Sequence, residues 1–206
     1  LGDVITKKSY DQFYDEHVFI FSALAIQKLF EKFNLELINL EPQLTHGGSM
    51  RYYLAHKGFY EKSENVDKII NQELNLGLNK EITFRKFSDD VKKSRNDLIK
   101  LLKSLKKEGK TIAGYAATSK STTILNYCGI GPDLIDYITD TTPIKQNKFS
   151  PGMHIPIVDY EYFKNNPPDY AFLFAWNHSK EIMEKEKDFM HSGGKFLTHV
   201  PEVRIL

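Results

Sequence analysis

The stretch TIAGYAATSKSTTILNYCGI, residues 111–130, gives the clearest indication of the fold class of this chain. Its first seven residues are mostly small and apolar, which predicts a short buried strand over 111–117. The segment that follows is a loop entering a helix. A second apolar run, LIDYITD at 134–140, predicts the next strand. A strand, a helix and a strand in this order predict parallel pairing through a helical crossover.

The same alternation continues toward the C-terminus. DYAFLFAW (169–176) and GGKFLTHV (193–200) predict a third and a fourth strand, with a helix over 179–192 between them. A proline-rich loop over 141–158 and a short helix near 159–166 separate the second strand from the third. Strands that alternate with helices predict an α/β fold, in which a parallel sheet of at least four strands has helices on both sides.

A change of composition after Gly58 marks a helical region. Residues 59–110 are rich in Lys, Asn, Glu and Leu and contain no proline. Within them, residues 88–110 carry apolar side chains on one helical face and charges elsewhere, and Gly109 is a suitable terminator. We therefore expect a long amphipathic helix here and a helical linkage over the whole of 59–110.

The first part of the chain predicts a small helix-strand-strand unit. Residues 17–33 fit a helix, while LELINLE (35–41) and MRYYLAH (50–56) fit strands, the first of them ended by Pro42. The expected buried face of the helix consists of Phe19, Ala23, Ile26, Phe30 and Phe33. This unit is too small to fold alone. The expected regions are 1–58, 59–110 and 111–206.

Composition excludes several classes of protein. Lys and Arg total 28 against 27 Asp and Glu, so the net charge of +1 indicates no basic face for general nucleic-acid binding. Cys128 is the single cysteine, which excludes an internal disulfide and a Cys-rich metal site within this chain. The apolar runs are far shorter than the roughly 20 residues that cross a bilayer, and no signal peptide is visible. We expect a cytoplasmic protein that binds neither nucleic acid nor membrane.

The loop GYAATSKSTT, residues 114–123, has two interpretations. It follows a strand and precedes a helix, where backbone N–H groups and the helix dipole favour a phosphate, and Lys120 is suited to pair with one. It contains neither GxGxxG nor GxxxxGK[ST], so a standard dinucleotide or ATP site is not expected, and an ordinary strand-to-helix turn is the alternative. At the end of the next strand, Asp140 either meets a ribose hydroxyl or caps the turn before TTP.

Two polar clusters also have both a structural and a functional interpretation. YDEH at 14–17 places a phenol, two carboxylates and an imidazole at the edge of an apolar run, which suits either catalysis or a helix N-cap at Asp15. THGGS at 45–49 is either a flexible turn between strands or a functional loop. The histidines show neither HxxxH nor HxH spacing, so we predict no metal site.

Five segments carry a resemblance that covers nearly the whole chain. They are YDEHVFIFS (14–22), HGGSMRYY (46–53), GYAATSKSTTILNYCGI (114–130), ITDTTPIKQNKFSPGMHIPI (138–157) and DYAFLFAWNH (169–178). Together and in this order they resemble the nucleotide-sugar C-methyltransferases, most closely the C-3 methyltransferases of dTDP-linked 4-keto deoxysugars. Members of that family have an N-terminal zinc-binding domain, a middle S-adenosylmethionine domain and a C-terminal Rossmann-like domain.

The resemblance implies that residues 1–58 are the end of the methyltransferase domain and that residues 111–206 are a Rossmann-like domain that binds the nucleotide-sugar. The chain departs from the family pattern because it has no cysteine cluster for zinc and no Gly-rich strand-turn before Tyr10. We therefore expect the C-terminal half of such an enzyme, inactive when alone. S-adenosylmethionine is then the cofactor of the complete enzyme, and zinc is expected only in the N-terminal domain.

By the same resemblance, Tyr14, Glu16 and His17 lie in the sugar site, with His17 as the base. The C-3 hydrogen of a 4-keto sugar is acidic because its removal gives an enolate delocalised onto the ketone oxygen. An unperturbed imidazole titrates near pH 6.5, so in its neutral form it accepts such a proton at physiological pH. Glu16 would then orient or polarise the imidazole, and Tyr14 would donate a hydrogen bond to the enolate oxygen.

Contacts to the dTDP-sugar are expected from the C-terminal domain. The candidates for the pyrophosphate, base and sugar are Lys120, Asn126, Lys145, His154 and Asn177. Two other function classes stay open at this point: a non-catalytic nucleotide-sugar-binding module, and a dinucleotide-binding domain of an oxidoreductase, which the missing GxGxxG disfavours.

Overall fold

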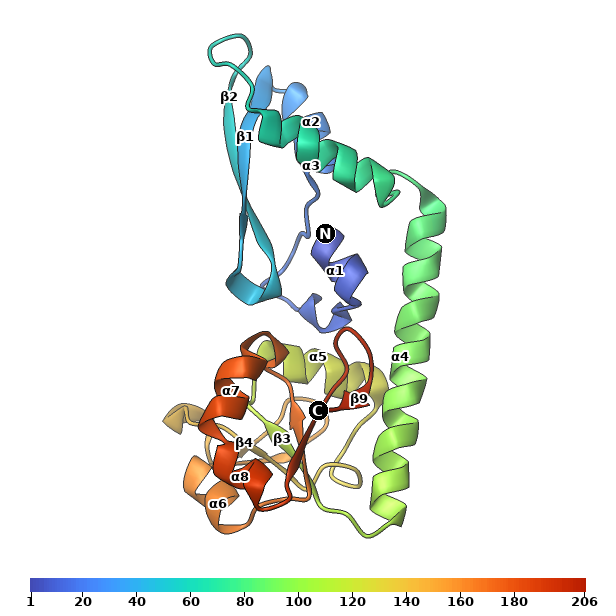
Figure 1. Ribbon diagram of the computed structural model, residues 1–206, viewed down its shortest axis with the longest axis vertical. Coiled ribbons are helices and arrows are strands. Elements are labelled where there is room, and N and C mark those ends of the chain that lie inside the picture. The colour runs from blue at the N-terminus through green and yellow to red at the C-terminus, as the bar shows by residue number, and fades with distance from the viewer. The chain divides into compact units, whose positions relative to one another are not determined.

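The computed structural model describes residues 1–206 and separates them into two compact units, each with its own sheet (Figure 1). Unit 1 comprises residues 1–9 and 17–90, and unit 2 comprises residues 10–16 and 91–206. Helix α4 (Glu81–Lys107) contributes residues to both units.

Unit 2 contains a seven-stranded sheet with the strand order β5-β6-β4-β3-β7-β8-β9. The strands are β3 (Ile112–Tyr115), β4 (Tyr137–Thr139), β5 (Lys148–Phe149), β6 (Pro156–Val158), β7 (Tyr170–Leu173), β8 (Lys195–Thr198) and β9 (Arg204–Ile205). The five inner strands pair in parallel, and the two edge strands pair antiparallel. The flanking helices of this unit are α5 (Ser119–Cys128), α6 (Tyr160–Asn165), α7 (Ser179–Lys185) and α8 (Lys187–His191) (Figure 1). This mostly parallel, helix-flanked sheet confirms the predicted Rossmann-like α/β fold class.

The central strand of this sheet requires a glycine. All four residues of β3 are buried, and Gly114 lies inside the strand. A Cβ atom at Gly114 would lie 2.5 Å from Cε2 of Phe174 and 2.9 Å from Cγ1 of Ile138. Carbon atoms in favourable contact are about 3.5–4.0 Å apart, so only glycine leaves room for the Phe174 ring against this strand.

Unit 1 is built around a two-stranded antiparallel sheet of β1 (Leu35–Gln43) and β2 (Ser49–His56). Its helices are α1 (Gly2–Lys7), α2 (Ala23–Glu31), α3 (Glu64–Asn75) and the first part of α4. Its core consists of Ala23, Ile26, Leu37, Leu40 and Val66. A register shift between Leu37 and Asn39 lets Leu37 and Leu40, three positions apart, both face this core.

The predicted helix over 17–33 is too long. Helix α2 begins only at Ala23, because the Ser22 side chain accepts the backbone N–H of Ala25 and caps the helix there, in place of the considered Asp15. Phe19 precedes the helix and is 73% exposed, and Phe33 follows it and is 64% exposed. Of the expected buried face, only the central residues lie in the core.

The strand predicted over 35–41 is too short. Strand β1 continues through Pro42, which lies opposite Met50 in the ladder. Both strands of a two-stranded sheet are edge strands, where a proline without an N–H is tolerated.

Several short elements were not predicted. Strands β5 and β6 lie inside the stretch 141–158, which the sequence indicated as a loop, and β9 follows the last predicted strand. Strands of two or three residues are too short for an alternating pattern to be recognised. Four 3₁₀ helices complete the chain: η1 (Tyr10–Gln12), η2 (Thr45–Gly47), η3 (Pro143–Lys145) and η4 (Trp176–His178). None of the helices combines the length and the apolar character needed to cross a membrane.

Candidate functional site

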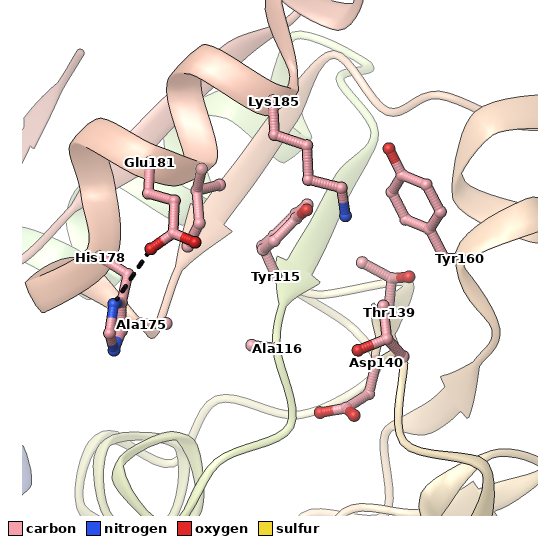
Figure 2. Close-up of a pocket in the computed structure, with 11 residues that line it drawn as sticks. Tyr115, Ala116, Thr139, Asp140, Tyr160, Ala175, His178, Glu181 and Lys185 are labelled. Atoms are coloured by element: carbon pink, nitrogen blue, oxygen red, sulfur yellow. Dashed lines mark ion pairs between the residues drawn. The ribbon is translucent and has the colours of Figure 1, made fainter.

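A pocket of about 320 Å³ opens at the carboxyl ends of β3, β4 and β7 in unit 2 (Figure 2). It is lined by Tyr115, Ala116, Thr139, Asp140, Thr141, Tyr160, Ala175, His178, Glu181, Ile182 and Lys185. From β3 the chain first builds β4 and β6 on one side of the sheet and then crosses to β7 on the other side. The pocket therefore lies where the order of the strands reverses, which is the usual position of ligands in open α/β sheets.

A buried carboxylate joins two tyrosines at this pocket. Glu186 is 4% exposed, and its Oε1 atom accepts hydrogen bonds from the hydroxyls of Tyr115 at 2.6 Å and Tyr160 at 2.8 Å. Burial, followed by the hydrogen bond to Glu186, raises the pKa of Tyr115 above that of an exposed tyrosine. The same two causes, burial first, raise the pKa of Tyr160 to about 12. Both phenols are therefore protonated donors at neutral pH.

This arrangement predicts a loss of stability at alkaline pH. An exposed tyrosine titrates near pH 10, so the folded chain holds the Tyr160 proton more tightly than the unfolded chain does. The resulting stabilisation is complete below about pH 10 and is lost as the pH rises toward 12. We expect the free energy of unfolding to fall less steeply above pH 10 in Tyr160→Phe than in wild type, measured by urea unfolding at several pH values.

The control for this prediction is Tyr60→Phe, which removes the hydroxyl of a tyrosine that is 66% exposed. It should leave the wild-type pH dependence in place. An identical slope above pH 10 in Tyr160→Phe and wild type would show that the phenol does not stabilise the fold through its proton.

Cationic and acidic side chains also line the pocket (Figure 2). The Nζ atom of Lys185 lies 3.9 Å from the ring centroid of Tyr160 and 3.6 Å from Oε1 of Glu186. Toward the other side, Nδ1 of His178 lies 3.5 Å from Oε2 of Glu181, with both side chains mostly exposed. The pocket thus combines aromatic faces, hydroxyl groups and one lysine ammonium group.

Asp140 is held mainly by the turn that follows β4. Its carboxylate accepts the backbone N–H of Thr142 and of Ala117, each at 2.8 Å, and Lys145 Nζ lies 3.3 Å from Oδ2. Burial opposes ionisation, but these hydrogen bonds and the Lys145 charge outweigh it and hold the pKa of Asp140 below its usual range. The turn-capping interpretation of Asp140 is therefore confirmed, and the same residue also lines the pocket.

Lys120 and Asn177, predicted separately, are brought together. Lys120 lies in the first turn of α5 and is only 7% exposed, and its Nζ donates to Oδ1 of Asn177 at 3.1 Å. Burial lowers the pKa of Lys120, an effect that the charge of Asp11 opposes. Thr118 caps the same helix through a reciprocal pair of hydrogen bonds with Ser121, so the loop is also an ordinary strand-to-helix turn.

None of the five predicted substrate contacts lines the pocket. Lys145 reaches it only through Asp140 and also donates to the carbonyl of Ala117 at 2.7 Å. Asn126 donates to the carbonyl of Pro151 at 3.0 Å and so ties α5 to the loop that carries the exposed His154.

The three predicted catalytic residues are divided between the units. Tyr14 and Glu16 belong to unit 2, and His17 belongs to unit 1. Burial, followed by the charges of Glu16 and Asp11, raises the pKa of Tyr14. Within unit 1, the His17 ring meets the ring of His46 edge-on, with centroids 5.9 Å apart. The two clusters YDEH and THGGS therefore meet through their histidines.

The backbone of the THGGS loop is strongly constrained. His46 has φ of 54°, and Gly48 has φ of 136°. A Cβ atom at Gly48 would lie 2.4 Å from the carboxylate of Asp3, and Lys7 donates to the carbonyl of Gly47. Within the chain, no group of three or more His, Cys, Asp or Glu side chains is arranged to hold a metal ion.

The sequence interpretation missed the tyrosines, Glu186 and Lys185. Tyr115 and Asp140 stand at the ends of neighbouring parallel strands, and applying the strand-end rule to every predicted strand would have identified Tyr115 as well. Nothing in the sequence links Tyr115 to Glu186, which is 71 positions away.

Comparisons with known proteins identify the family. Residues 44–201 match the family described as the C-methyltransferase C-terminal domain. The chain is 33% identical over 207 residues to the C-methyltransferase NovU of Streptomyces niveus, in an alignment that covers all of this chain and 49% of that protein. The chain thus spans about half the length of the curated relative it matches. It belongs to the C-methyltransferase family and contains the C-terminal domain of that family.

Proposed function

We propose that the chain is the nucleotide-sugar-binding half of a C-methyltransferase that uses S-adenosylmethionine. In this proposal the complete enzyme methylates a carbon, C-3, of a dTDP-linked 4-keto deoxysugar in the cytoplasm. Residues 1–58 end the methyltransferase domain, residues 59–110 link the two parts, and residues 111–206 hold the nucleotide-sugar. The observation that carries the proposal is the pocket at the reversal of the strand order in unit 2.

The chemistry of the pocket suits a nucleoside diphosphate. Its volume of about 320 Å³ falls within the usual range of small-molecule sites. The side chains of Tyr160 and Ile182 offer apolar surface to a base, and the hydroxyl of Thr141 offers a hydrogen-bond partner. Lys185 supplies a positive charge to a diphosphate.

The predicted lysines extend this positive character around the pocket. Lys145 lies beside Asp140, and Lys120 lies beside Asn177, the residue before the pocket-lining His178. A diphosphate in the pocket would therefore meet the ammonium group of Lys185, and the charges of Lys120 and Lys145 would lie farther out. All five predicted contacts are proposed only as outer contacts to the diphosphate, sugar or base, because none of them lines the pocket: Lys120, Asn126, Lys145, His154 and Asn177.

The proposed chemistry of this chain is a proton transfer. His17 accepts the C-3 proton of the sugar through a neutral imidazole nitrogen, and the electrons of the C–H bond delocalise onto the C-4 ketone as an enolate. Tyr14 donates a hydrogen bond to the enolate oxygen, and Glu16 orients the His17 imidazole. S-adenosylmethionine, when bound, supplies the methyl group.

The residues of the pocket do not fit S-adenosylmethionine. The Asp140 carboxylate, which would have to accept ribose hydroxyls, already accepts two backbone N–H groups and faces Lys145. Lys185 would also repel the sulfonium charge. We therefore assign the pocket to the nucleotide-sugar alone.

Calorimetric titration of the 206-residue chain with dTDP, S-adenosylmethionine and NAD, each separately, tests this proposal. We expect heat of binding with dTDP and none with the other two ligands at micromolar concentrations. Tight binding of NAD would favour the oxidoreductase alternative, and tight binding of S-adenosylmethionine would contradict the assignment of the pocket. If the complete enzyme binds dTDP-sugar but transfers no methyl group, the chain is a non-catalytic binding module.

Loss of the Lys185 charge should weaken dTDP binding specifically. A hydrogen bond between an ammonium group and a phosphate contributes about 1.5–3 kcal/mol, so we expect Lys185→Gln to raise the Kd of dTDP by roughly tenfold or more. Lys180→Gln removes the same charge from the same helix at a position that does not line the pocket. Equal Kd values for the two variants would mean that the diphosphate does not meet Lys185.

A further inference from the structure

A fully buried carboxylate lies near the pocket and outside its lining. Asp11, in η1, and His199, just after β8, are both 0% exposed. Oδ2 of Asp11 accepts the indole N–H of Trp176 at 2.7 Å and lies 3.4 Å from Nε2 of His199. Oδ1 of Asp11 and both ring nitrogens of His199 have no hydrogen-bond partner within the chain. The carboxylate thus has one well-formed hydrogen bond, and that bond is to Trp176.

This arrangement of a buried carboxylate and a buried imidazole is expected to destabilise the fold. A buried charge loses the stabilisation of its hydration shell, and an incompletely hydrogen-bonded pair recovers only part of that loss. Apolar residues of similar volume at such positions are often neutral or stabilising. The surroundings are apolar, since the His199 ring is packed edge-on against Tyr10 and Phe172. A buried carboxylate in this setting is better explained by the specific geometry that it imposes than by a contribution to stability.

The geometry that Asp11 imposes joins two functional segments of unit 2. Asp11 lies in the segment Tyr10–Glu16, which also contains the proposed catalytic residues Tyr14 and Glu16. Its partner Trp176 lies in η4, between the pocket-lining residues Ala175 and His178.

Further contacts hold this junction on both sides. The carbonyl of Phe13 accepts a hydrogen bond from the Thr123 hydroxyl at 3.2 Å, which ties the segment to α5. On the other side, the ammonium of Lys120 lies 5.7 Å from the centroid of the Trp176 ring. The hydrogen bond between Asp11 and Trp176 is therefore the direct link between the segment and the wall of the pocket.

We propose that Asp11 is a positioning residue, which acts through Trp176 and His199 to hold Tyr14 and Glu16 in register with a ligand in the pocket. This inference rests on the proposed function, because it assigns Asp11 a role in the proposed methyl transfer. A displacement of about 1 Å in a catalytic group can cost 10²-fold in rate, so loss of the link should lower kcat while the contacts to the nucleotide remain.

The experiment compares kcat, KM for the nucleotide-sugar and melting temperature of the complete enzyme. We expect Asp11→Ala to lower kcat by about 10- to 100-fold with little change in KM. Asp11→Asn keeps an oxygen acceptor for the indole N–H and should restore part of kcat. Trp176→Phe removes the donor but keeps an aromatic ring, and it should lower kcat as well. In the double variant of Asp11→Ala and Trp176→Phe, the two losses should not add, because they break the same bond.

Spectroscopy of the 206-residue chain gives a second readout. Trp176 is the single tryptophan, so its emission reports directly on this hydrogen bond. Asp11→Ala should shift the emission maximum of the folded chain. The matched control is Asp169→Asn. The Asp169 carboxylate accepts the backbone N–H and the hydroxyl of Thr111 at the N-terminal ends of β3 and β7, away from the pocket at their carboxyl ends. This control should lower the melting temperature while leaving kcat and emission unchanged.

A failure of the positioning role of Asp11 can be distinguished from a failure of the proposed function. If the wild-type enzyme transfers no methyl group to a nucleotide-sugar, the proposed function fails and the role of Asp11 fails with it. If the wild-type enzyme is active and Asp11→Ala and Trp176→Phe lower only the melting temperature, the proposed function stands and the positioning role is wrong. Additive losses of kcat in the double variant would also overturn it.

Discussion

His17→Asn in the complete methyltransferase is expected to lower kcat by about 10²- to 10⁴-fold, the usual contribution of a general base. The side-chain amide of asparagine has no basic nitrogen that accepts the C-3 proton, although it is polar and similar in size to imidazole. The affinity for dTDP should change little, because His17 is not among the residues that line the pocket. Three measurements test this prediction: kcat from steady-state kinetics with the nucleotide-sugar, the Kd of dTDP from calorimetry, and the melting temperature.

Supporting variants make this prediction specific. Tyr14→Phe and Glu16→Gln should lower kcat less than His17→Asn does, because they support the enolate or the imidazole without accepting the proton. His191→Asn changes an exposed histidine on α8, outside the pocket, and should leave kcat unchanged. If His17→Asn melts several degrees lower but turns over at the wild-type rate, His17 is structural and the proposed base is wrong.

Phe172→Ala is expected to destabilise unit 2 more than any other substitution considered for this chain. Phe172 lies in β7 with no exposed surface, and its ring lies 4.5 Å from that of Phe174 and 5.7 Å from that of His199, centroid to centroid. Truncation of a buried phenylalanine to alanine typically costs about 3–5 kcal/mol through lost contacts and the cavity left behind. For a protein of this length we expect the melting temperature to fall by roughly 6–20 °C, measured by differential scanning calorimetry.

Phe149→Ala is the matched control for this prediction. Phe149 belongs to the same sheet, in the edge strand β5, and is 64% exposed, so its truncation leaves no buried cavity. Its melting temperature should stay within about 2 °C of wild type, the usual range for surface substitutions. Similar losses in both variants would mean that the core of the sheet is not packed as described.

The central sheet of unit 2 was predictable because its signals are local. Residues 111–130 combine a short apolar strand with a capped helix, and the structure places β3 and α5 there. The parallel pairing follows from the length of the crossover between one strand and the next. The need for Gly114 was not predicted, because its reason is the ring of Phe174, which follows β7 and is 60 positions away.

The start of α2 was predicted wrongly because two signals conflict. The apolar residues from position 18 onward have helical spacing, which predicts an earlier start of the helix. The helix begins only after Ser22, because the Ser22 side chain accepts the backbone N–H of Ala25 and caps the helix there. A side-chain cap outweighs an apolar pattern when the residues before it have no core to bury them, and Phe19 is accordingly exposed.

The pocket was only partly predictable, because the residues that contact one another there are far apart in the sequence. Lys120 and Asn177 were chosen from separate motifs, and only the fold brings them within 3.1 Å of each other. The link between Tyr115 and Glu186 and the link between Asp11 and Trp176 span 71 and 165 positions. Local sequence patterns indicate the ends of strands, but they do not indicate which distant side chain meets them there.

A crystal structure of this chain with dTDP is the decisive test of the proposed nucleotide-sugar site, because it locates the ligand without assuming any activity. We expect dTDP to occupy the pocket at the ends of β3, β4 and β7, with its diphosphate within hydrogen-bond distance of Lys185 Nζ and its base against Tyr160. dTDP bound elsewhere on the chain, or absent from the pocket at saturating concentration, would show that this pocket is not the nucleotide-sugar site.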